Sequence, residues 1–312
     1  MDLSVVTVSW NVRELLIASL ASVYASLDGS GIPYEVLVVD NASTDGSPDM
    51  VRERFPQVRL MANAENKGFA AASNQGMAQA CGRYMVLLNP DTVLDGDALA
   101  MLLRFMENTP SAGMAGPRLA YPDGQFQHSA FRFPALAQPF FDFFPVHYRL
   151  VASRLNGRYP RSLYARERAF PIDHPLGACM MVRRQVLERV GGLDEGFFMY
   201  CEEVDWAMRI KRAGWSIYCV PTARVVHYAG QSTQQFRHEM FVALWRSRLR
   251  LYAKHRGAFD NRMLRLIVRA GLWNEGRKAR HQAEAGLISR EELAGRLTAY
   301  QSVREMTHAR NR

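Results

Sequence analysis

Three carboxylates fall within four positions of the chain, at Glu202, Glu203 and Asp205. Repulsion between like charges in such a cluster raises the pKa of at least one carboxyl, which suits a general base. An aromatic-rich stretch, residues 197–200, leads into the cluster. We therefore expect all three acids to be catalytic. The alternative for Asp205 is a helical ion pair with Arg209, four positions later.

Polar residues also follow three predicted strands, as Ser9-Trp10-Asn11, Asp40-Asn41-Ala42-Ser43 and Asn89-Pro90-Asp91. Ligands of open parallel sheets bind at the carboxyl ends of the strands, so three such ends predict a nucleotide pocket. Asp91 is the metal candidate, because a hard cation that bridges a diphosphate needs only one or two protein carboxylates. His227 ends a later strand and would add an imidazole ligand. Plain turn and packing roles are the alternatives for Asp91 and His227.

The common phosphate-binding loops are absent from the sequence. No G-x-G-x-x-G follows the first strand and no G-x-x-x-x-G-K-[ST] occurs, so dinucleotide oxidoreductases and P-loop NTPases lose their main support. A sugar nucleotidyltransferase is the nearest enzymatic alternative. It would carry a glycine-rich, basic loop after the first strand, where residues 9–13 contain no glycine.

The elements that must position these residues alternate between strand and helix in the first half of the chain. The apolar and helical patterns predict strands at 3–10, 34–40, 58–61 and 84–88, with helices at 13–27, from 47, and at 68–80. This alternation predicts a parallel sheet with helices on both faces. Residues 125–171 are rich in aromatics and prolines and predict irregular packing or an acceptor-binding loop. Later patterns predict strands at 179–182, 216–220 and 224–227, a helix at 204–213, and a helical tail from about 236.

Composition and charge bound the class of protein. The 312 residues are 48% hydrophobic and 22% charged, as in a soluble globular protein, and no run approaches the ~20 apolar residues of a membrane span. The first residues lack a secretory pattern, and four cysteines without a CxxC pair suit a reducing cytoplasm. Residues 1–230 carry 22 basic and 23 acidic side chains, whereas residues 231–312 carry 17 and 7. We therefore expect a catalytic domain over 1–230 and a basic helical extension over 231–312.

Taken in order, these motifs resemble those of glycosyltransferase family 2, in its bacterial rhamnosyltransferase-like branch. The motifs that carry the resemblance are Asp40-Asn41-Ala42-Ser43, Asn66-Lys67-Gly68-Phe69, Asn89-Pro90-Asp91, Gly177-Ala178-Cys179-Met180, Gly192-Leu193-Asp194-Glu195 and Glu203-Val204-Asp205-Trp206. The resemblance covers residues 3–230. It implies a GT-A fold, which is an α/β, Rossmann-like nucleotide-binding sheet with helices on both faces. It also implies a dTDP- or UDP-sugar donor, a divalent metal (Mg²⁺ or Mn²⁺) and inversion at the anomeric carbon.

The resemblance also implies a role for individual residues. Asp40 would contact the base or ribose of the nucleotide, with Asn11 and Asn66 nearby. Asn89-Pro90-Asp91 takes the place of the metal-binding D-x-D motif, with Asn89 replacing its first acid, and His227 would be the late metal ligand. Glu203 would be the base, although the family more often has Asp there and Glu202 remains the alternative. The complete donor site is expected to comprise Ser9, Asn11, Asp40, Asn41, Asn66, Gly68, Asn89 and Asp91.

The branch implies dTDP-rhamnose as donor and a glycan or lipid-linked acceptor in cell-surface polysaccharide synthesis. A non-catalytic basic protein that binds membranes or nucleic acid is the alternative from another class, but it leaves the acidic cluster without a purpose. We expect no nucleic-acid partner and a cytoplasmic enzyme at the inner face of the membrane. The basic residues expected to contact anionic lipid are Arg246, Arg248, Arg250, Lys254 and Arg256. The alternative is that they cap helices or pair with acids.

Overall fold

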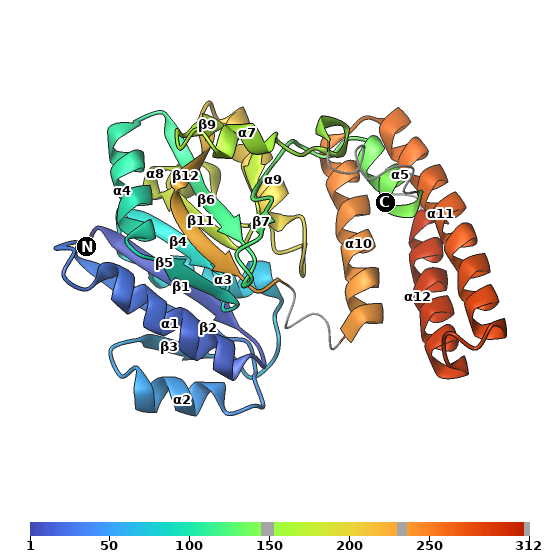
Figure 1. Cartoon of the computed structure of the whole chain (residues 1–312), viewed down its shortest axis with the longest axis horizontal. Helices are drawn as coiled ribbons and strands as arrows, with labels where there is room; N and C mark the ends of the chain where they lie inside the picture. The colour runs from blue at the N-terminus through green and yellow to red at the C-terminus, as the bar shows by residue number, and fades with distance from the viewer. Residues whose placement is uncertain (145–152, 230–235, 309–312) are drawn as a thin grey trace. The chain divides into compact units, whose positions relative to one another are not determined.

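The computed structural model describes residues 1–144, 153–229 and 236–308. The chain forms two compact units (Figure 1). The sheet unit comprises Met1–Phe133, Tyr159–Phe198 and Glu202–Ser232, and the helical unit comprises Pro134–Arg158, Met199–Cys201 and Thr233–Arg312. The expected boundary between residues 230 and 231 lies outside the described residues and stays a prediction.

The sheet unit is built on a mixed sheet with the strand order β3-β2-β1-β4-β11-β6-β12-β5. Its strands are β1 (Leu3–Ser9), β2 (Tyr34–Asp40), β3 (Arg59–Ala62), β4 (Tyr84–Leu88), β5 (Thr92–Asp95), β6 (Ala112–Ala120), β11 (Cys179–Arg183) and β12 (Ser216–His227), with β7 (Phe126–Gln127) and β9 (Phe170–Pro171) paired at the side. A separate two-stranded sheet joins β8 (Ala130–Phe131) and β10 (His174–Pro175).

The strands predicted in the first half of the chain form the expected parallel sheet, and the later strands add antiparallel pairs to it. β3, β2, β1 and β4 are parallel, but β11 pairs antiparallel with both β4 and β6, and β5 pairs antiparallel with β12. The two short strands predicted at 216–220 and 224–227 are one strand, β12, whose register shifts between Val220 and Arg224. Pro221 lies inside this irregularity, where a residue without an N–H is tolerated.

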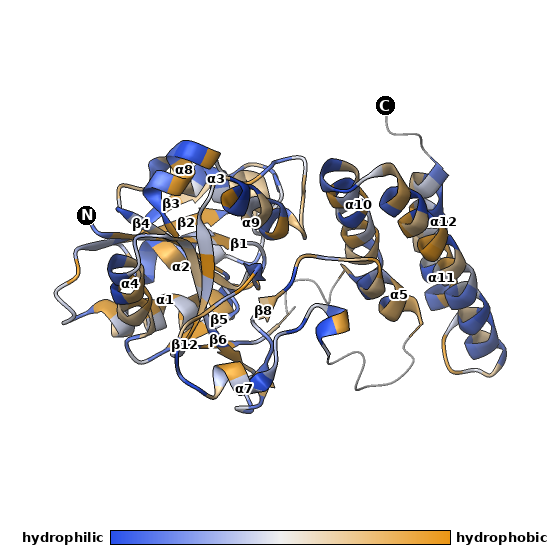
Figure 2. Ribbon diagram, turned by 90° about the horizontal axis from the view of Figure 1, so that it is seen from above, coloured by the Kyte–Doolittle hydropathy of each residue, from blue (hydrophilic) through white to orange (hydrophobic). Residues whose placement is uncertain are grey.

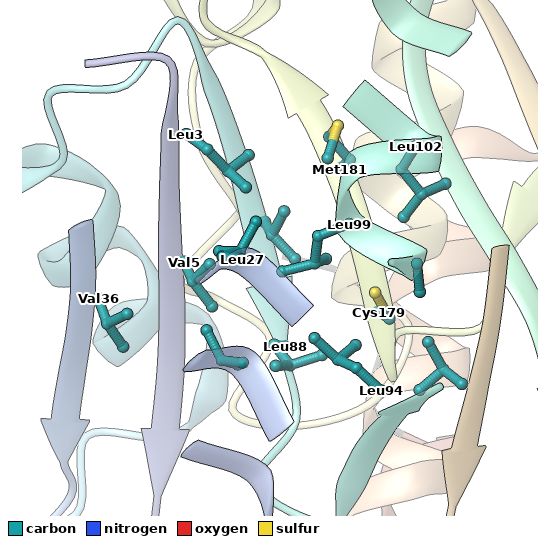
Figure 3. Packing of buried hydrophobic residues seen from close by; sticks show 14 of the residues in the cluster. Leu3, Val5, Leu27, Val36, Leu88, Leu94, Leu99, Leu102, Cys179 and Met181 are labelled. Atoms are coloured by element: carbon teal, nitrogen blue, oxygen red, sulfur yellow. The ribbon is translucent and has the colours of Figure 1, made fainter. Parts of the chain in front are cut away.

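Helices cover both faces of the sheet, as predicted. Those of the sheet unit are α1 (Arg13–Leu27), α2 (Ser47–Arg54), α3 (Phe69–Gln79), α4 (Ala98–Asn108), α7 (Arg161–Tyr164), α8 (Arg184–Val190) and α9 (Glu202–Arg212). Side chains of α1, α2 and α4 pack with Val5 and Val36 on one face (Figure 3). Side chains of α3, α8 and α9 pack with Val6 and Leu37 on the other. Successive strand residues point to opposite faces, so one strand serves both cores.

The helical unit has its own core. It contains α5 (Ala137–Phe143), the 3₁₀ turn Arg154–Asn156 and the long helices α10 (Arg237–His255), α11 (Ala258–Glu284) and α12 (Arg290–His308). The long helices alternate hydrophilic and hydrophobic residues (Figure 2). Phe143 stacks on Trp245, with ring centroids 4.7 Å apart, and packs against Gly271. Part of the aromatic 125–171 segment is therefore core packing for this unit. Within the described residues, no helix has the length and apolarity needed to cross a bilayer.

Candidate active site

The ends of β1 and β2 meet because the two strands are parallel and in register. Ser9 pairs with Asp40, and the backbone N–H of Asn41 donates to the Ser9 carbonyl at 2.8 Å. The Asn11 side-chain oxygen accepts the N–H of Thr44 at 2.8 Å, while the Asn11 N–H donates to the Ser43 hydroxyl at 2.9 Å. These bonds join the two loops after the strands into one surface, as the prediction of a nucleotide pocket requires.

One carboxylate oxygen of Asp40 has no hydrogen-bond partner among the described residues. Its carboxylate is buried, and Oδ2 accepts the Ser43 N–H at 2.9 Å. Oδ1 has no hydrogen-bond partner among the described residues, and neither has the buried hydroxyl of Ser9. An unsatisfied buried polar group costs about 1–3 kcal/mol, which a ligand hydroxyl or amide can recover. Both atoms therefore suit a bound nucleoside.

Asn41 is held by hydrogen bonds to the loop of residues 63–68. It is buried, and its Nδ2 donates to Asn66 Oδ1 at 2.8 Å and to the Gly68 carbonyl at 3.3 Å. Its Oδ1 accepts the Lys67 N–H at 3.0 Å and the amide of Asn63 at 3.2 Å. These four bonds use the hydrogen-bonding capacity of the amide. Asn41 therefore holds the 63–68 loop beside the end of β2, and its contact with the donor stays a prediction.

Gly68 is also packed against protein. Its φ is +82° and its ψ 167°, and a Cβ there would lie 2.6 Å from the Phe198 carbonyl oxygen and 2.7 Å from the Phe198 ring. The next N–H, of Phe69, donates to that carbonyl at 2.8 Å. Gly68 thus lets the loop before α9 approach the start of α3, and its contact with the donor stays a prediction.

Asp91 and His227 come together at the ends of neighbouring strands, as predicted. His227 pairs with Thr92 across β12 and β5, and the Tyr228 N–H donates to the Asp91 carbonyl at 2.9 Å. The His227 Nε2 lies 3.5 Å from Asp91 Oδ1, and both side chains are at most 9% exposed. At this distance the contact is too long for a strong hydrogen bond, but it is within the span of two ligands that share a cation.

Gln127 orients the side chain of His227. Its buried Oε1 lies 3.2 Å from His227 Nδ1. An amide oxygen only accepts, so this bond requires the hydrogen on Nδ1 and leaves the lone pair of Nε2 directed toward Asp91. Metal-binding histidines show this arrangement, in which the second ring nitrogen is held by another protein group. No sequence motif surrounds Gln127, so only the fold reveals its part.

Asn89, two positions before Asp91, also has a side-chain oxygen without a hydrogen-bond partner among the described residues. This Oδ1 is buried, and the Asn89 N–H donates to the Ala178 carbonyl at 2.9 Å. Across 1–144, 153–229 and 236–308, no cluster of three or more His, Cys, Asp or Glu side chains has the geometry of a metal site. A cation here would take Asp91 and His227 from the protein, with phosphate and water oxygens completing its shell.

The acidic cluster begins α9, beside the residues just described. Glu203 is half-buried, and its carboxyl carbon lies 3.8 Å from the position of a Cβ on Gly177. Since Ala178 follows Gly177 and bonds to Asn89, the acid and the Asp91 turn lie at the same edge of the sheet. Glu202 is buried, and its pKa is raised well above the ordinary value by that burial and by the charge of Glu203. Glu202 therefore retains its proton more readily, which favours Glu203 as the proton acceptor.

Asp205 forms the ion pair that was the alternative to a catalytic role. Its buried carboxylate accepts from Arg209 Nε at 2.8 Å. Arg209 also donates to the carbonyls of Val190 at 3.0 Å and Gly192 at 2.7 Å. The bonds fasten α9 to the 190–192 turn. The pair gives Asp205 a positioning role, and its catalytic role stays a prediction.

Backbone strain marks the same loops. Among the described non-glycine residues, positive φ angles occur at Asn11, Ala42, Glu167, Tyr200, Cys201 and Ala229. All but Glu167 follow a strand end of the site or precede the acidic cluster. Such conformations cost about 1–3 kcal/mol each and concentrate at functional sites. Asn11 is of a type that favours this conformation, whereas the residue types at the other positions do not indicate it.

Comparison with known proteins gives consistent matches. The family model described as glycosyl transferase family 2 matches residues 4–191. N-acetylglucosaminyl-diphospho-decaprenol L-rhamnosyltransferase of Mycobacterium tuberculosis is 34% identical over 220 residues, covering 64% of this chain and 68% of that protein. Rhamnosyltransferase WbbL of Escherichia coli K12 is 29% identical over 176 residues, covering 55% of this chain and 62% of that protein.

A solved structure shares the fold. The mannosyltransferase PcManGT from Pyrobaculum calidifontis, in complex with GDP-Man and Mn²⁺, superposes with a TM-score of 0.57 at 19% identity, covering 98% of this chain and 84% of that one. The expected fold class, a GT-A sheet with helices on both faces plus a helical C-terminal region, is confirmed.

Proposed function

Because the chain belongs to glycosyl transferase family 2, we propose that it is a metal-dependent, inverting enzyme that transfers L-rhamnose from dTDP-rhamnose. The acceptor is a glycan or a lipid-linked sugar in cell-surface polysaccharide synthesis, reached at the cytoplasmic face of the membrane. The rhamnosyltransferases among its relatives support the sugar and the kind of acceptor. A UDP-sugar is the alternative donor.

The observation that carries this proposal is the pair of Asp91 and His227, oriented by Gln127. The 3.5 Å between Asp91 Oδ1 and His227 Nε2, the lone pair directed by Gln127 and the unpartnered Asn89 Oδ1 nearby fit a small divalent cation. When bound, Mg²⁺ or Mn²⁺ supplies positive charge to the leaving diphosphate. The nucleoside would occupy the surface formed after β1 and β2, where Asp40 Oδ1 accepts a hydrogen bond from its ribose or base.

Glu203 would remove the proton from the acceptor hydroxyl as that oxygen attacks the anomeric carbon. Attack opposite the leaving diphosphate inverts the anomeric configuration in a single displacement. Burial and the charge of Glu203 raise the pKa of Glu202, so Glu203 is the acid that ionises more readily and is the proposed base. Asp205 and Arg209 hold α9, and thereby Glu203, against the 190–192 turn.

The base is tested by comparing Glu203→Gln with Glu202→Gln under saturating donor. Glu203→Gln should lower turnover by roughly 10²–10⁴-fold and leave nucleotide binding nearly unchanged, since the amide keeps the shape but cannot accept the proton. Glu202→Gln, which mimics a carboxyl that is already protonated, should keep most of the activity. The reverse ranking would move the base to Glu202.

The metal site is tested by Mn²⁺ titration of the wild-type protein, Asp91→Ala and His227→Ala with dTDP present. Both variants should bind Mn²⁺ more weakly. Undiminished activity in excess chelator would refute metal dependence.

The donor is identified by the rise in melting temperature that each nucleotide sugar produces, since a ligand of the native state stabilises it. We expect the largest rise with dTDP-rhamnose. Proton NMR of the product then reports whether the anomeric configuration has inverted.

A further inference from the structure

Large apolar side chains are exposed along one helix of the helical unit. On α11 they are Phe259, Leu266 and Trp273, which are 72%, 48% and 64% exposed, and Leu287 in the turn that follows is 74% exposed. Most large apolar residues of the described chain are covered. Three of the most exposed thus lie on α11, and a fourth follows it.

The three helical residues are spaced seven apart, and this spacing places them on the same face. Seven residues span nearly two turns and about 10.5 Å, so Phe259, Leu266 and Trp273 form a line about 21 Å long. The opposite face of α11 is occupied, because Leu264, Val268 and Leu272 are buried in the core of the helical unit. The line is therefore a second apolar face, additional to the one that folding uses.

Basic side chains flank this line. Arg262, Arg277 and Arg280 are exposed, and the Arg277 guanidinium lies 4.8 Å from the centroid of the Trp273 ring. Of the acids on the helix, Asp260 and Glu275 are half-buried, Glu275 accepts from Lys278 at 2.8 Å, and Glu284 is at the last position. The exposed face between Phe259 and Arg280 therefore combines apolar residues with positive charge.

We propose that this face of α11 binds the surface of an anionic bilayer. A tryptophan, a phenylalanine and a leucine in line, edged by arginines, match the interface between headgroups and acyl chains, where apolar residues insert and arginines meet phosphates. Residues 231–312 carry 17 basic and 7 acidic side chains, and this net positive charge complements the negative charge of anionic lipid headgroups.

This proposal relocates the membrane contact that the sequence predicted on α10. Arg248 donates to Asp142 at 2.5 Å and lies over the Trp245 ring, and Arg256 donates to the Pro134 carbonyl. Two of the five predicted lipid contacts are thus used inside the helical unit, where the helix-capping and pairing alternative applies. The proposal deepens the placement at the membrane given above, but it does not depend on the identity of the sugar or the acceptor.

The test is co-sedimentation of the full chain with vesicles, without donor or metal. The wild type should bind vesicles of equal parts phosphatidylglycerol and phosphatidylcholine, bind pure phosphatidylcholine at least tenfold more weakly, and detach at high salt. Leu266→Glu/Trp273→Glu should lower the affinity at least tenfold. The matched control is Leu155→Glu, which changes a 59% exposed leucine of the same unit and should bind like wild type.

Two further measurements distinguish membrane binding through α11 from binding through α10. Arg262→Glu/Arg277→Glu/Arg280→Glu should abolish binding, whereas Arg246→Glu/Arg250→Glu/Lys254→Glu on α10 should reduce it less. Brominated lipids should quench wild-type fluorescence more than that of Trp273→Phe. Wild-type binding by the Leu266/Trp273 variant overturns the proposal, as does a dimer that this variant dissociates. Circular dichroism and turnover on a soluble acceptor show whether the fold and the proposed activity persist.

Discussion

Replacing Gly68 by alanine tests whether this glycine serves packing or ligand binding, and Gly191 provides a matched control. Gly68 has φ +82° and ψ 167°, and Gly191 has φ +81° and ψ 177°, so both occupy a region that is almost exclusive to glycine. Alanine costs about 1–3 kcal/mol there, whatever surrounds it. The two sites differ in space. No atom lies within 4 Å of a Cβ on Gly191, whereas Phe198 blocks one on Gly68.

The magnitude follows from that difference. The new methyl of Gly68→Ala would lie 2.6 Å from a backbone oxygen, which cannot turn away without moving the loop before α9. Overpacking of this kind costs about 1–3 kcal/mol more. We therefore expect Gly191→Ala to lose about 1–3 kcal/mol of unfolding free energy and Gly68→Ala about 2–6 kcal/mol. Because that loop leads directly into the first turn of α9, where Glu203 lies, a shift of about 1 Å should also cost Gly68→Ala roughly 10²-fold in turnover.

The assay is urea unfolding followed by circular dichroism, with turnover measured at a temperature where every variant is folded. Gly191→Ala should lose less turnover than Gly68→Ala, because no atom blocks its new methyl group. Adding Phe198→Ala to Gly68→Ala removes the ring but not the carbonyl, so it should restore little stability. Equal losses in the two single variants would refute the packing argument, and full rescue by Phe198→Ala would show that the ring is the obstacle.

Three further predictions concern charge and burial. Burial raises the pKa of Glu202, so the unfolded state releases this proton at a lower pH than the folded state. The unfolding free energy of the wild type should therefore fall as pH rises above about 4.5, by up to about 1.4 kcal/mol per pH unit. Urea titrations of Glu202→Gln should show a weaker dependence of the unfolding free energy on pH. Burial lowers the pKa of His174 to about 4, so the neutral imidazole stabilises the fold at neutral pH. This contribution to the unfolding free energy should be lost as pH falls from about 6.5 toward 4, and the loss should be absent in His174→Phe. Asp205→Asn should cost about 3–5 kcal/mol of unfolding free energy, because it leaves Arg209 without its charged partner. A lower kcat with an unchanged unfolding free energy would instead support a catalytic role for Asp205.

The sequence by itself was sufficient to predict the buried strands and the acidic residues that follow or begin the regular elements. Apolar runs in β1, β2 and β4 predicted buried parallel strands, because a strand covered on both faces excludes polar residues. The order of the polar strand ends and of the acidic cluster predicted the fold class. It also indicated Asp40, Asp91 and Glu203, since these acids follow or begin regular elements whose direction is known.

Only the tertiary structure shows which residues that are distant in the chain pair as strands or form hydrogen bonds with one another. The reversal of β11 and the continuity of β12 depend on strand partners far away in sequence, so local pattern could not reveal them. Asn41 is predicted to contact the donor, and the structure shows that its amide also holds the 63–68 loop. Gln127 carries no motif, yet it lies 3.2 Å from a histidine one hundred positions later. A residue's type specifies what it can bind, whereas the fold determines which partner reaches it first.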